Sequence, residues 1–167
     1  MGIVSFLQYQ FQTRPNPSNP TQPIVHVQPG QASLYFGGVL MDVTIGVDAI
    51  TSQALLAAGH LVPNPIITKA LVDTGCTVTS IDQTLVTSLN LRTLGFTRIA
   101  TANGITPVTQ HEISLNFPGT PLSGKPILSV QSANLANQPF HILIGRDLMS
   151  NWTITYNGPA GFVSIAD

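Results

Sequence analysis

An apolar run that ends on one carboxylate is the feature that most constrains this chain. Residues 69–82 read KALVDTGCTVTSID, so the run leads directly to Asp73, and a Thr-Gly pair follows. A lone Asp-Thr-Gly also suits a structural turn, in which the aspartate caps the backbone. Burying an ionised carboxylate by itself is very costly, so Asp73 needs a partner if the run carries it into a core.

The composition argues against several classes of function. Charged residues make up 8% of the 167-residue chain, and the formal net charge is -1, whereas about a quarter of the residues in a typical domain are charged. The chain has no basic stripe, which is the electrostatic footprint of nucleic-acid binding, and no polybasic membrane site. No apolar run is long enough for a transmembrane helix. We therefore expect neither nucleic acid nor a membrane as a partner.

The single cysteine, Cys76, rules out an internal disulfide framework. A small buried residue is a simpler role for it than a nucleophile, because the spacing places none of the four histidines beside it. The histidines also lack a metal-binding pattern, and no Gly-rich phosphate loop is present, so no metal and no organic cofactor is expected. Residues 1–14 do not resemble a signal peptide, and we expect a cytoplasmic protein.

The distribution of proline predicts how the chain is organised. Proline, asparagine and glutamine are concentrated in residues 13–30, which indicates an extended N-terminal arm over residues 1–32 and one compact domain over residues 33–167. Residues 34–47 alternate as a strand with one apolar side. Residues 50–65 fit either a short helix or a loop.

Three further patterns predict a mostly β domain. Two β-type runs flank Asn103-Gly104, which is a strong hairpin signal. A buried strand ending at Asp73 precedes a helical pattern that Ser80 or Asp82 can cap. A second buried strand, in residues 140–150, is followed by a tight Gly turn and a short helix. The chain is thus expected to contain two short helices, each of which follows a buried strand.

The segment ALVDTGCTVTSID, followed at residues 142–149 by ILIGRDLM, resembles the retropepsin-like aspartic proteases, which are single-domain relatives of pepsin. The resemblance covers roughly residues 35–165 and leaves out the N-terminal arm. It implies an all-β, closed-barrel-like acid protease fold with two short helices and a flap hairpin. It also implies an aspartic endopeptidase that hydrolyses peptide or protein substrates.

The chemistry of that family predicts a second copy of the chain. The site requires two aspartates about 3 Å apart, because two carboxyl groups at that distance share a proton, and one acts as base and the other as acid. The chain contains one Asp-Thr-Gly, and Asp147 is not followed by Thr-Gly. The resemblance therefore implies a homodimer in which each Asp73 is the partner of the other.

The residues around Asp73 take their expected roles from the same resemblance. Thr74 would hydrogen-bond across the dimer, Gly75 would allow close approach of the backbone, and Cys76 would lie beside them. Gly145 would let the second buried strand turn under the catalytic loop. Arg146 would support that loop and the dimer.

The Asn-Gly hairpin would be the flap that covers the substrate and excludes water. Its tip consists of Ala102, Asn103, Gly104 and Ile105. Ala102 and Ile105 would touch the substrate.

Two positions depart from the family's pattern. Cys76 stands where alanine, serine or threonine is common, and Thr77 stands where retroviral members carry an acid that pairs with the arginine. Arg146 then needs another acceptor, for which Asp82, Asp147 and backbone carbonyl groups are candidates. These departures leave a second interpretation open, in which the domain is a catalytically inactive peptide-binding or dimerisation module.

Overall fold

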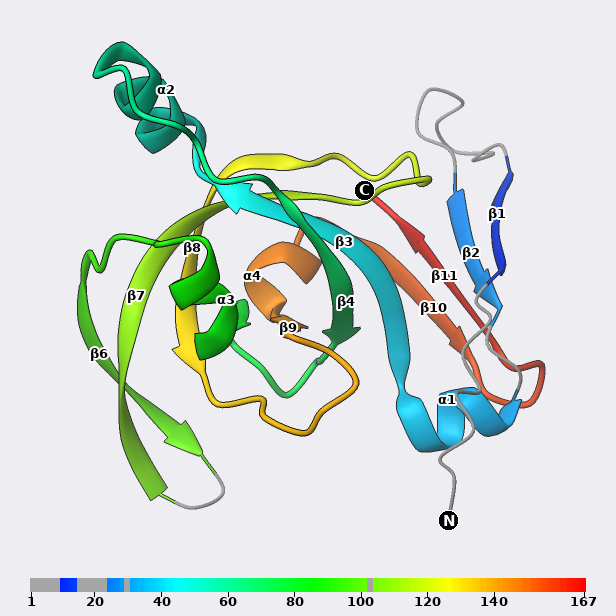
Figure 1. Ribbon diagram of the computed structural model, residues 1–167. Coiled ribbons are helices and arrows are strands. Elements are labelled where there is room, and N and C mark those ends of the chain that lie inside the picture. The colour runs from blue at the N-terminus through cyan, green and yellow to red at the C-terminus, as the bar shows by residue number, and fades with distance from the viewer. Residues whose placement is uncertain (1–9, 15–23, 29–30, 102–103) are drawn as a thin grey trace.

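The computed structural model describes residues 10–14, 24–28, 31–101 and 104–167, and this part of the chain is mostly β (Figure 1). Its strands are β1 (Gln10–Arg14), β2 (Ile24–Gln28), β3 (Val39–Val47), β4 (Ile66–Val72), β5 (Ser80–Asp82), β6 (Gly95–Thr101), β7 (Gly104–Asn116), β8 (Lys125–Ala133), β9 (Ile142–Ile144), β10 (Thr153–Asn157) and β11 (Phe162–Ala166). Its helices are α1 (Gln31–Gly37), α2 (Ala49–Ala57), α3 (Gln83–Ser88) and α4 (Arg146–Met149).

The larger of two sheets has seven strands in the order β3-β4-β9-β5-β8-β7-β6. Strand β3 also pairs with β7, so the pairings lead from β3 round to β7 and back to β3. The pairs β4–β9 and β5–β8 are parallel, while the other pairs in this sheet are antiparallel. Since β4 and β9 are parallel neighbours, the loops that follow them leave the sheet at the same edge.

The smaller sheet joins the two ends of the chain in the order β1-β2-β11-β10 (Figure 1, right). Residues 25–27 of β2 pair with residues 163–165 of β11. The segment predicted as an extended arm therefore contains two strands that the sequence analysis missed. The run Ile24–Val27 is a β-type segment between prolines, and prolines near a strand's ends do not prevent ladder pairing within it.

The prediction of two short helices is wrong, because the described residues form four. Residues 31–37, partly expected as a strand, form α1, which ends at Gly38 in a left-handed conformation with φ of 69°. The amide of Gly38 donates to the carbonyl of Leu34, so this glycine caps the helix and β3 begins only at Val39. Helix α2 occupies the segment for which a helix or a loop was expected, and Asp48 caps it by accepting from the amide of Thr51.

Other local predictions are confirmed. Strands β6 and β7 form the expected hairpin, whose pairing extends to Thr101 and Gly104. Helix α3 comes after β4, its loop and the short strand β5, and its N-cap is Asp82. Strand β4 itself is mostly half-buried, with only Ala70 fully buried, so the expected buried strand is found in part. Helix α4 follows β9 directly after Gly145.

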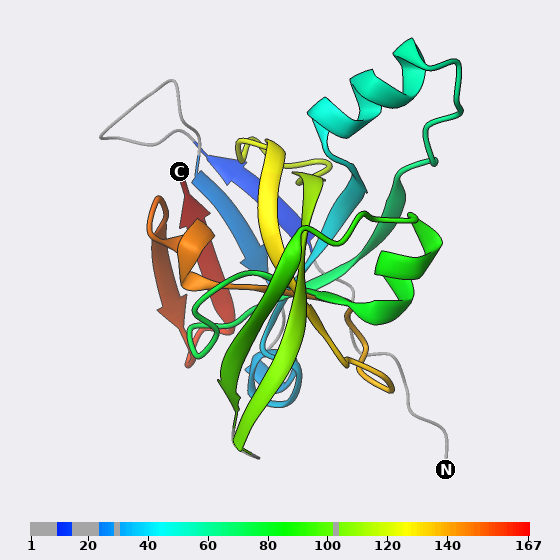
Figure 2. The same ribbon diagram turned by 90° about the vertical axis from the view of Figure 1, so that its left-hand side faces the viewer.

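One apolar core lies between the strands. In β3 the side chains of Met41, Val43 and Ile45 are fully buried, as the alternating pattern predicts. Residues from β7, β9 and β11 complete this core, among them Ile113, Leu115, Ile142, Ile144, Val163 and Ile165. Helix α2 buries none of its residues and stands away from the sheets (Figure 2).

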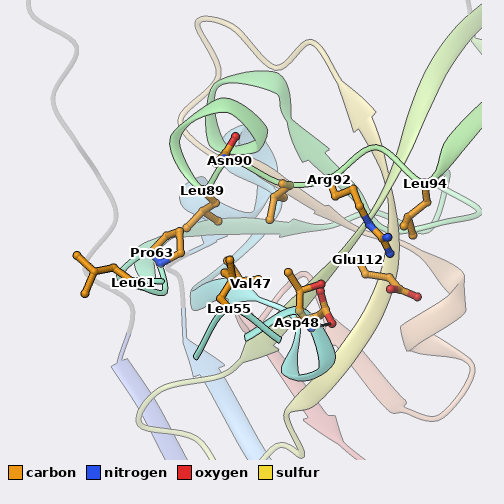
Figure 3. A pocket seen from close by; sticks show the side chains of 12 residues that line it. Val47, Asp48, Leu55, Leu61, Pro63, Leu89, Asn90, Arg92, Leu94 and Glu112 are labelled. Atoms are coloured by element: carbon orange, nitrogen blue, oxygen red, sulfur yellow. Dashed lines mark hydrogen bonds between the residues drawn. The ribbon is translucent and has the colours of Figure 1, made fainter. Parts of the chain in front are cut away.

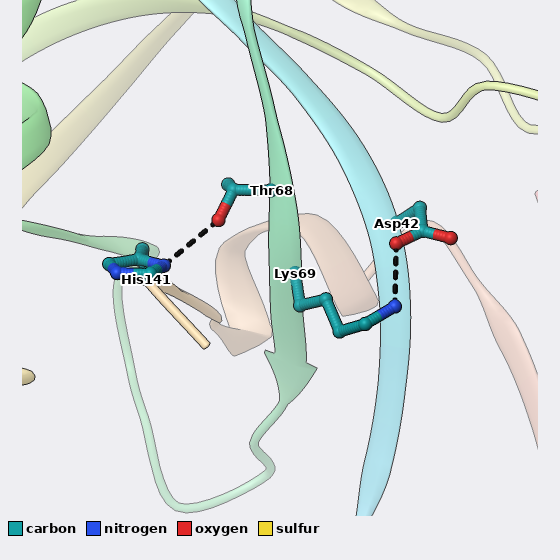
Figure 4. A network of polar contacts seen from close by, with 4 residues as sticks. All are labelled: Asp42, Thr68, Lys69 and His141. Carbon is teal, nitrogen blue, oxygen red and sulfur yellow. Dashed lines mark hydrogen bonds and ion pairs between the residues drawn. The ribbon is translucent and has the colours of Figure 1, made fainter. Parts of the chain in front are cut away.

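Polar contacts on β4 help to hold it between its neighbours (Figure 4). Lys69 Nζ donates to Asp42 Oδ1 on β3 at 2.7 Å. Thr68 Oγ1 lies 2.9 Å from Nδ1 of His141, the residue before β9. Strand β4 is thereby tied on one side to β3 and on the other to the start of β9.

Asp82 is a buried carboxylate, only 3% exposed, that connects α3 to the loop before β9. One carboxylate oxygen accepts from the amide and hydroxyl groups of Thr84, and the other accepts from the amide of Leu135 at 2.8 Å. Burial raises the pKa of Asp82, but these hydrogen bonds outweigh it, so the pKa lies below its usual range. Its contribution to stability is therefore complete above the ordinary pKa of an aspartate, and it is lost as the pH falls through the lowered value.

We predict that Asp82→Ala lowers the free energy of unfolding by about 2–4 kcal/mol, because it removes a helix cap and leaves the buried amide of Leu135 without an acceptor. Asp48→Ala is the matched control: it removes the cap of α2, which buries no residue, and should cost about 1 kcal/mol or less. Urea denaturation at neutral pH measures both. Equal losses for the two variants would contradict this role for Asp82.

Candidate active site

Asp73 lies immediately after β4, beside the carboxyl end of β9. Its amide donates to the carbonyl of Ile144 at 3.0 Å, which continues the parallel ladder one residue beyond the strand. The Asp73 side chain is half-buried, and Thr74 and Gly75 are exposed. The carboxylate is therefore placed at a surface and is not enclosed within the single chain.

The backbone turns sharply around this carboxylate. Asp73 Oδ1 accepts from the amide of Gly75 at 2.8 Å, and the amide of Cys76 donates to the Asp73 carbonyl at 3.0 Å. A Cβ on Gly75 would lie 3.1 Å from Asp73 Oδ1, which is closer than most side chains come, so glycine favours this approach. Among the described residues, none donates a hydrogen bond to Asp73 Oδ2, so the hydrogen bond that the carboxylate accepts from this part of the chain is at Oδ1.

Arg146 holds the loop from its exposed side. Nη1 donates to the carbonyl of Thr74 at 2.6 Å, and Nη2 donates to the hydroxyl of Thr77 at 2.8 Å. The amide of Arg146 also donates to the carbonyl of Cys76 at 2.9 Å. The acceptors of the guanidinium are thus a backbone carbonyl, which was one of the candidates, and the Thr77 hydroxyl itself.

Asp147 and Gly145 hold the loop from its buried side. The carboxylate of Asp147 accepts from the amide of Thr79 at 3.0 Å and from its hydroxyl at 2.8 Å. The amide of Gly145 donates to the same hydroxyl at 3.1 Å. A Cβ on Gly145 would lie 2.7 Å from backbone atoms of Val78 and Thr79, so only glycine allows the two segments to pack this closely.

Cys76 points into the protein. Its Sγ donates to the carbonyl of Val78 at 2.9 Å and lies 3.7 Å from Ser80 Oγ. Burial raises the pKa of the Cys76 thiol, the hydrogen bond with Ser80 lowers it, and the negative charge of Asp73 raises it; the pKa is raised as a result. A thiol that stays protonated is a poor nucleophile, which favours the structural role for this cysteine.

The hairpin residues stand apart from the loop. Gly104 and Ile105 are exposed, and neither is hydrogen-bonded to residues 73–79. Ala102 and Asn103, also predicted as the flap tip, lie outside the described residues. Figure 1 shows β6 and β7 extending at the lower left, while the loop after β4 lies in the lower centre.

A cavity of about 260 Å³ lies away from Asp73. Figure 3 shows it between the base of α2 and the segment that follows α3. Its lining is mostly apolar, with three acidic or basic residues: Val47, Asp48, Thr51, Leu55, Leu61, Pro63, Leu89, Asn90, Leu91, Arg92, Leu94 and Glu112. None of the predicted site residues contributes to it.

The structure brings together the six predicted residues of the two loops: Asp73, Thr74, Gly75, Cys76, Gly145 and Arg146. Sequence reasoning did not find Thr77 as an acceptor for Arg146, or the contact between Thr79 and Asp147. A threonine carries no signal of its own in a loop, and these partners lie far apart in the sequence.

Within residues 10–14, 24–28, 31–101 and 104–167, histidine, cysteine, aspartate and glutamate form no group of three or more that could hold a metal ion. No helix in this part of the chain is both long and apolar enough to span a membrane.

The comparisons with known proteins found similarity to several solved structures, of which one is described here. No family model matches the sequence, and no curated protein matches it either. The crystal structure of a retropepsin-like aspartic protease from Rickettsia conorii is similar to 98% of this chain and 97% of its own, with a TM-score of 0.46 and 9% sequence identity.

We predict that Gly145→Ala lowers the free energy of unfolding by about 1–3 kcal/mol, because the added methyl group overlaps the backbone at Val78 and Thr79. Gly95→Ala is the control, since the nearest atom to its Cβ is the mobile end of Gln110 at 3.5 Å. The control should change stability by less than about 0.5 kcal/mol. Thermal and urea unfolding of both variants test the close approach, and equal effects would show that Gly145 is not needed there.

Proposed function

We propose that this chain is an aspartic endopeptidase that acts as a homodimer with a closed-barrel-like retropepsin fold. The observation that carries the proposal is the loop at Asp73, which is fastened to Gly145 and Arg146 while its carboxylate remains half-buried at the surface. A carboxylate with one oxygen that accepts no hydrogen bond from the described residues suits a site that a second chain completes.

The other carboxylates of the chain support a partner from a second copy. Asp42 pairs with Lys69, and Asp48 and Asp82 cap helices. Both oxygens of Asp147 are engaged by Thr79. The remaining two acids are also placed elsewhere: Glu112 lines the cavity beside α2, and Asp167 accepts from the amide of Ser123. No second carboxylate of the described chain is therefore available to Asp73.

In the proposed reaction, two Asp73 side chains share one proton and hold a water molecule between them. The ionised Asp73 takes a proton from this water, which attacks the scissile carbonyl carbon of the peptide. The protonated Asp73 of the other chain donates to the developing oxyanion. Collapse of the tetrahedral species breaks the C–N bond, and a proton passes to the leaving amine. These steps require no metal and no organic cofactor.

Thr74 and Gly75 are exposed and adjacent to Asp73, which suits the proposed roles in dimer contact and close backbone approach. The proposed flap residues Ala102, Asn103, Gly104 and Ile105 would close over a bound peptide. The exposed side chain of Ile105 supports a role in substrate contact for the last of them. A dimer that binds peptides without turnover is the competing function, and it uses the same surfaces.

Cleavage of peptides by the unchanged chain, and its loss on replacement of Asp73 by asparagine, separate these two functions. We predict that Asp73→Asn lowers the rate of peptide cleavage by about 10²–10⁴-fold or more, because the pair loses its shared proton and its base. Asp42→Asn, which changes a carboxylate on β3 outside the proposed site, should cleave at the rate of the unchanged chain. Turnover of a mixed peptide library is measured together with circular dichroism.

The proposal fails if the unchanged chain binds peptides but does not cleave them, which is the result expected of a binding module. It also fails if Asp73→Asn retains full activity. A pepstatin-type transition-state analogue should inhibit the unchanged chain, since it occupies the position of the proposed tetrahedral species.

A further inference from the structure

The contact between Asp147 and Thr79 has no role in the chemistry proposed so far. Thr79 is fully buried at the end of the loop that begins with Asp73. Its amide and hydroxyl groups both donate to the Asp147 carboxylate, and its carbonyl accepts from the amide of Gln131 on β8. Thr79 is therefore held on one side by α4 and on the other by the larger sheet.

We propose that Asp147 is a positioning residue of the candidate active site: through Thr79, its carboxylate fixes the loop that carries Asp73. This inference rests on the proposed function. Asp147 itself does not touch the reacting atoms, because both of its oxygens face Thr79 and its own helix.

The number of hydrogen bonds explains why a carboxylate stands at this position. Oδ1 accepts from the Thr79 hydroxyl and from the amide of Leu148, and Oδ2 accepts from the Thr79 amide. An asparagine offers one oxygen, so its NH₂ group would face either an N–H donor or the Thr79 hydroxyl. An NH₂ group facing the Thr79 hydroxyl would take away the acceptor that its O–H group now has in Asp147.

The connection from Thr79 to Asp73 passes through a short and well-anchored loop. Between these residues the carbonyl of Cys76 accepts from Arg146, and the carbonyl of Thr77 accepts from the amide of Asp147. Loss of the Asp147 carboxylate releases the buried side of this loop, while the Arg146 contacts remain on the exposed side. A displacement of about 1 Å in a reacting group is enough to lower a rate by about 10²-fold.

Peptide hydrolysis by Asp147→Asn, Thr79→Val and the double variant tests the proposal. We expect kcat to fall about 10–100-fold in each single variant, with KM within about twofold of the unchanged chain, because neither residue contacts substrate. The double variant should be no slower than the slower single variant, since both changes remove the same contact. Thr79→Ser keeps the hydroxyl and should retain the rate, and Asp42→Asn is the control for loss of a distant carboxylate.

Amide hydrogen exchange supplies a readout that needs no activity. We expect Asp147→Asn to raise exchange at Gly145, Arg146 and Asp147 by about tenfold or more, without change in the β10–β11 hairpin. If Asp147→Asn does not fold, the comparison of Thr79→Val with Thr79→Ser decides the same question.

The outcomes separate this proposal from the proposed function. If the unchanged chain does not cleave peptides, the proposed function fails, and exchange alone then decides whether Asp147 fixes the loop. Unchanged exchange at the amides of Gly145, Arg146 and Asp147, which donate to that loop, overturns the positioning role. Additive losses in kcat, or a loss that appears in KM alone, overturn it as well.

Discussion

The parallel pairing of β4 with β9 is the constraint on which the candidate site depends. It brings the ends of two strands together that lie some seventy residues apart in the sequence, and the hydrogen bond from the Asp73 amide to Ile144 extends the ladder into the loop. From that point the two segments remain in contact through the carbonyl groups of Cys76 and Thr77. The close packing at Gly145 is possible only because this residue has no side chain.

Because charged residues are scarce in this chain, few groups could serve as a partner for Asp73. The chain has seven acidic residues, and six of them either contact groups outside their own loop, cap a helix or lie at the cavity beside α2. Asp73 is the exception, because the hydrogen bond that its carboxylate accepts comes from Gly75 in the same turn. Arg146 donates its guanidinium hydrogen bonds to two neutral acceptors, the Thr74 carbonyl and the Thr77 hydroxyl, and the described residues show no ion pair between Arg146 and Asp73. A carboxylate left in this state at a surface suits pairing with its own copy, because two such groups share one proton when they meet.

Patterns within short segments predicted much of the fold. The alternation in β3, the Asn-Gly hairpin and the Asp82 cap each depend on neighbouring residues, and each is found. Helix α1 was not predicted, because its last residues belong to the run that predicts the following strand. The left-handed conformation of Gly38, which separates the helix from that strand, is seen only in the structure.

The candidate site divides in the same way. Asp73, Gly145 and Arg146 were recognisable in short motifs. The contact of Thr79 with Asp147 joins distant segments and leaves no local pattern, and the same holds in the fold for the pairing of β2 with β11. Of the two acceptors of Arg146, a backbone carbonyl was among the candidates, whereas the Thr77 hydroxyl was not predicted.

The central claim is that one catalytic site needs Asp73 from two chains. Mixing the unchanged chain with Asp73→Asn at a fixed total concentration, above that needed for dimer formation, tests it most directly. If both aspartates are required and the chains pair at random, an equal mixture retains about one quarter of the activity, since only the dimers of two unchanged chains are active. An equal mixture that retains half of the activity would mean that each chain carries its own site, and would contradict the account.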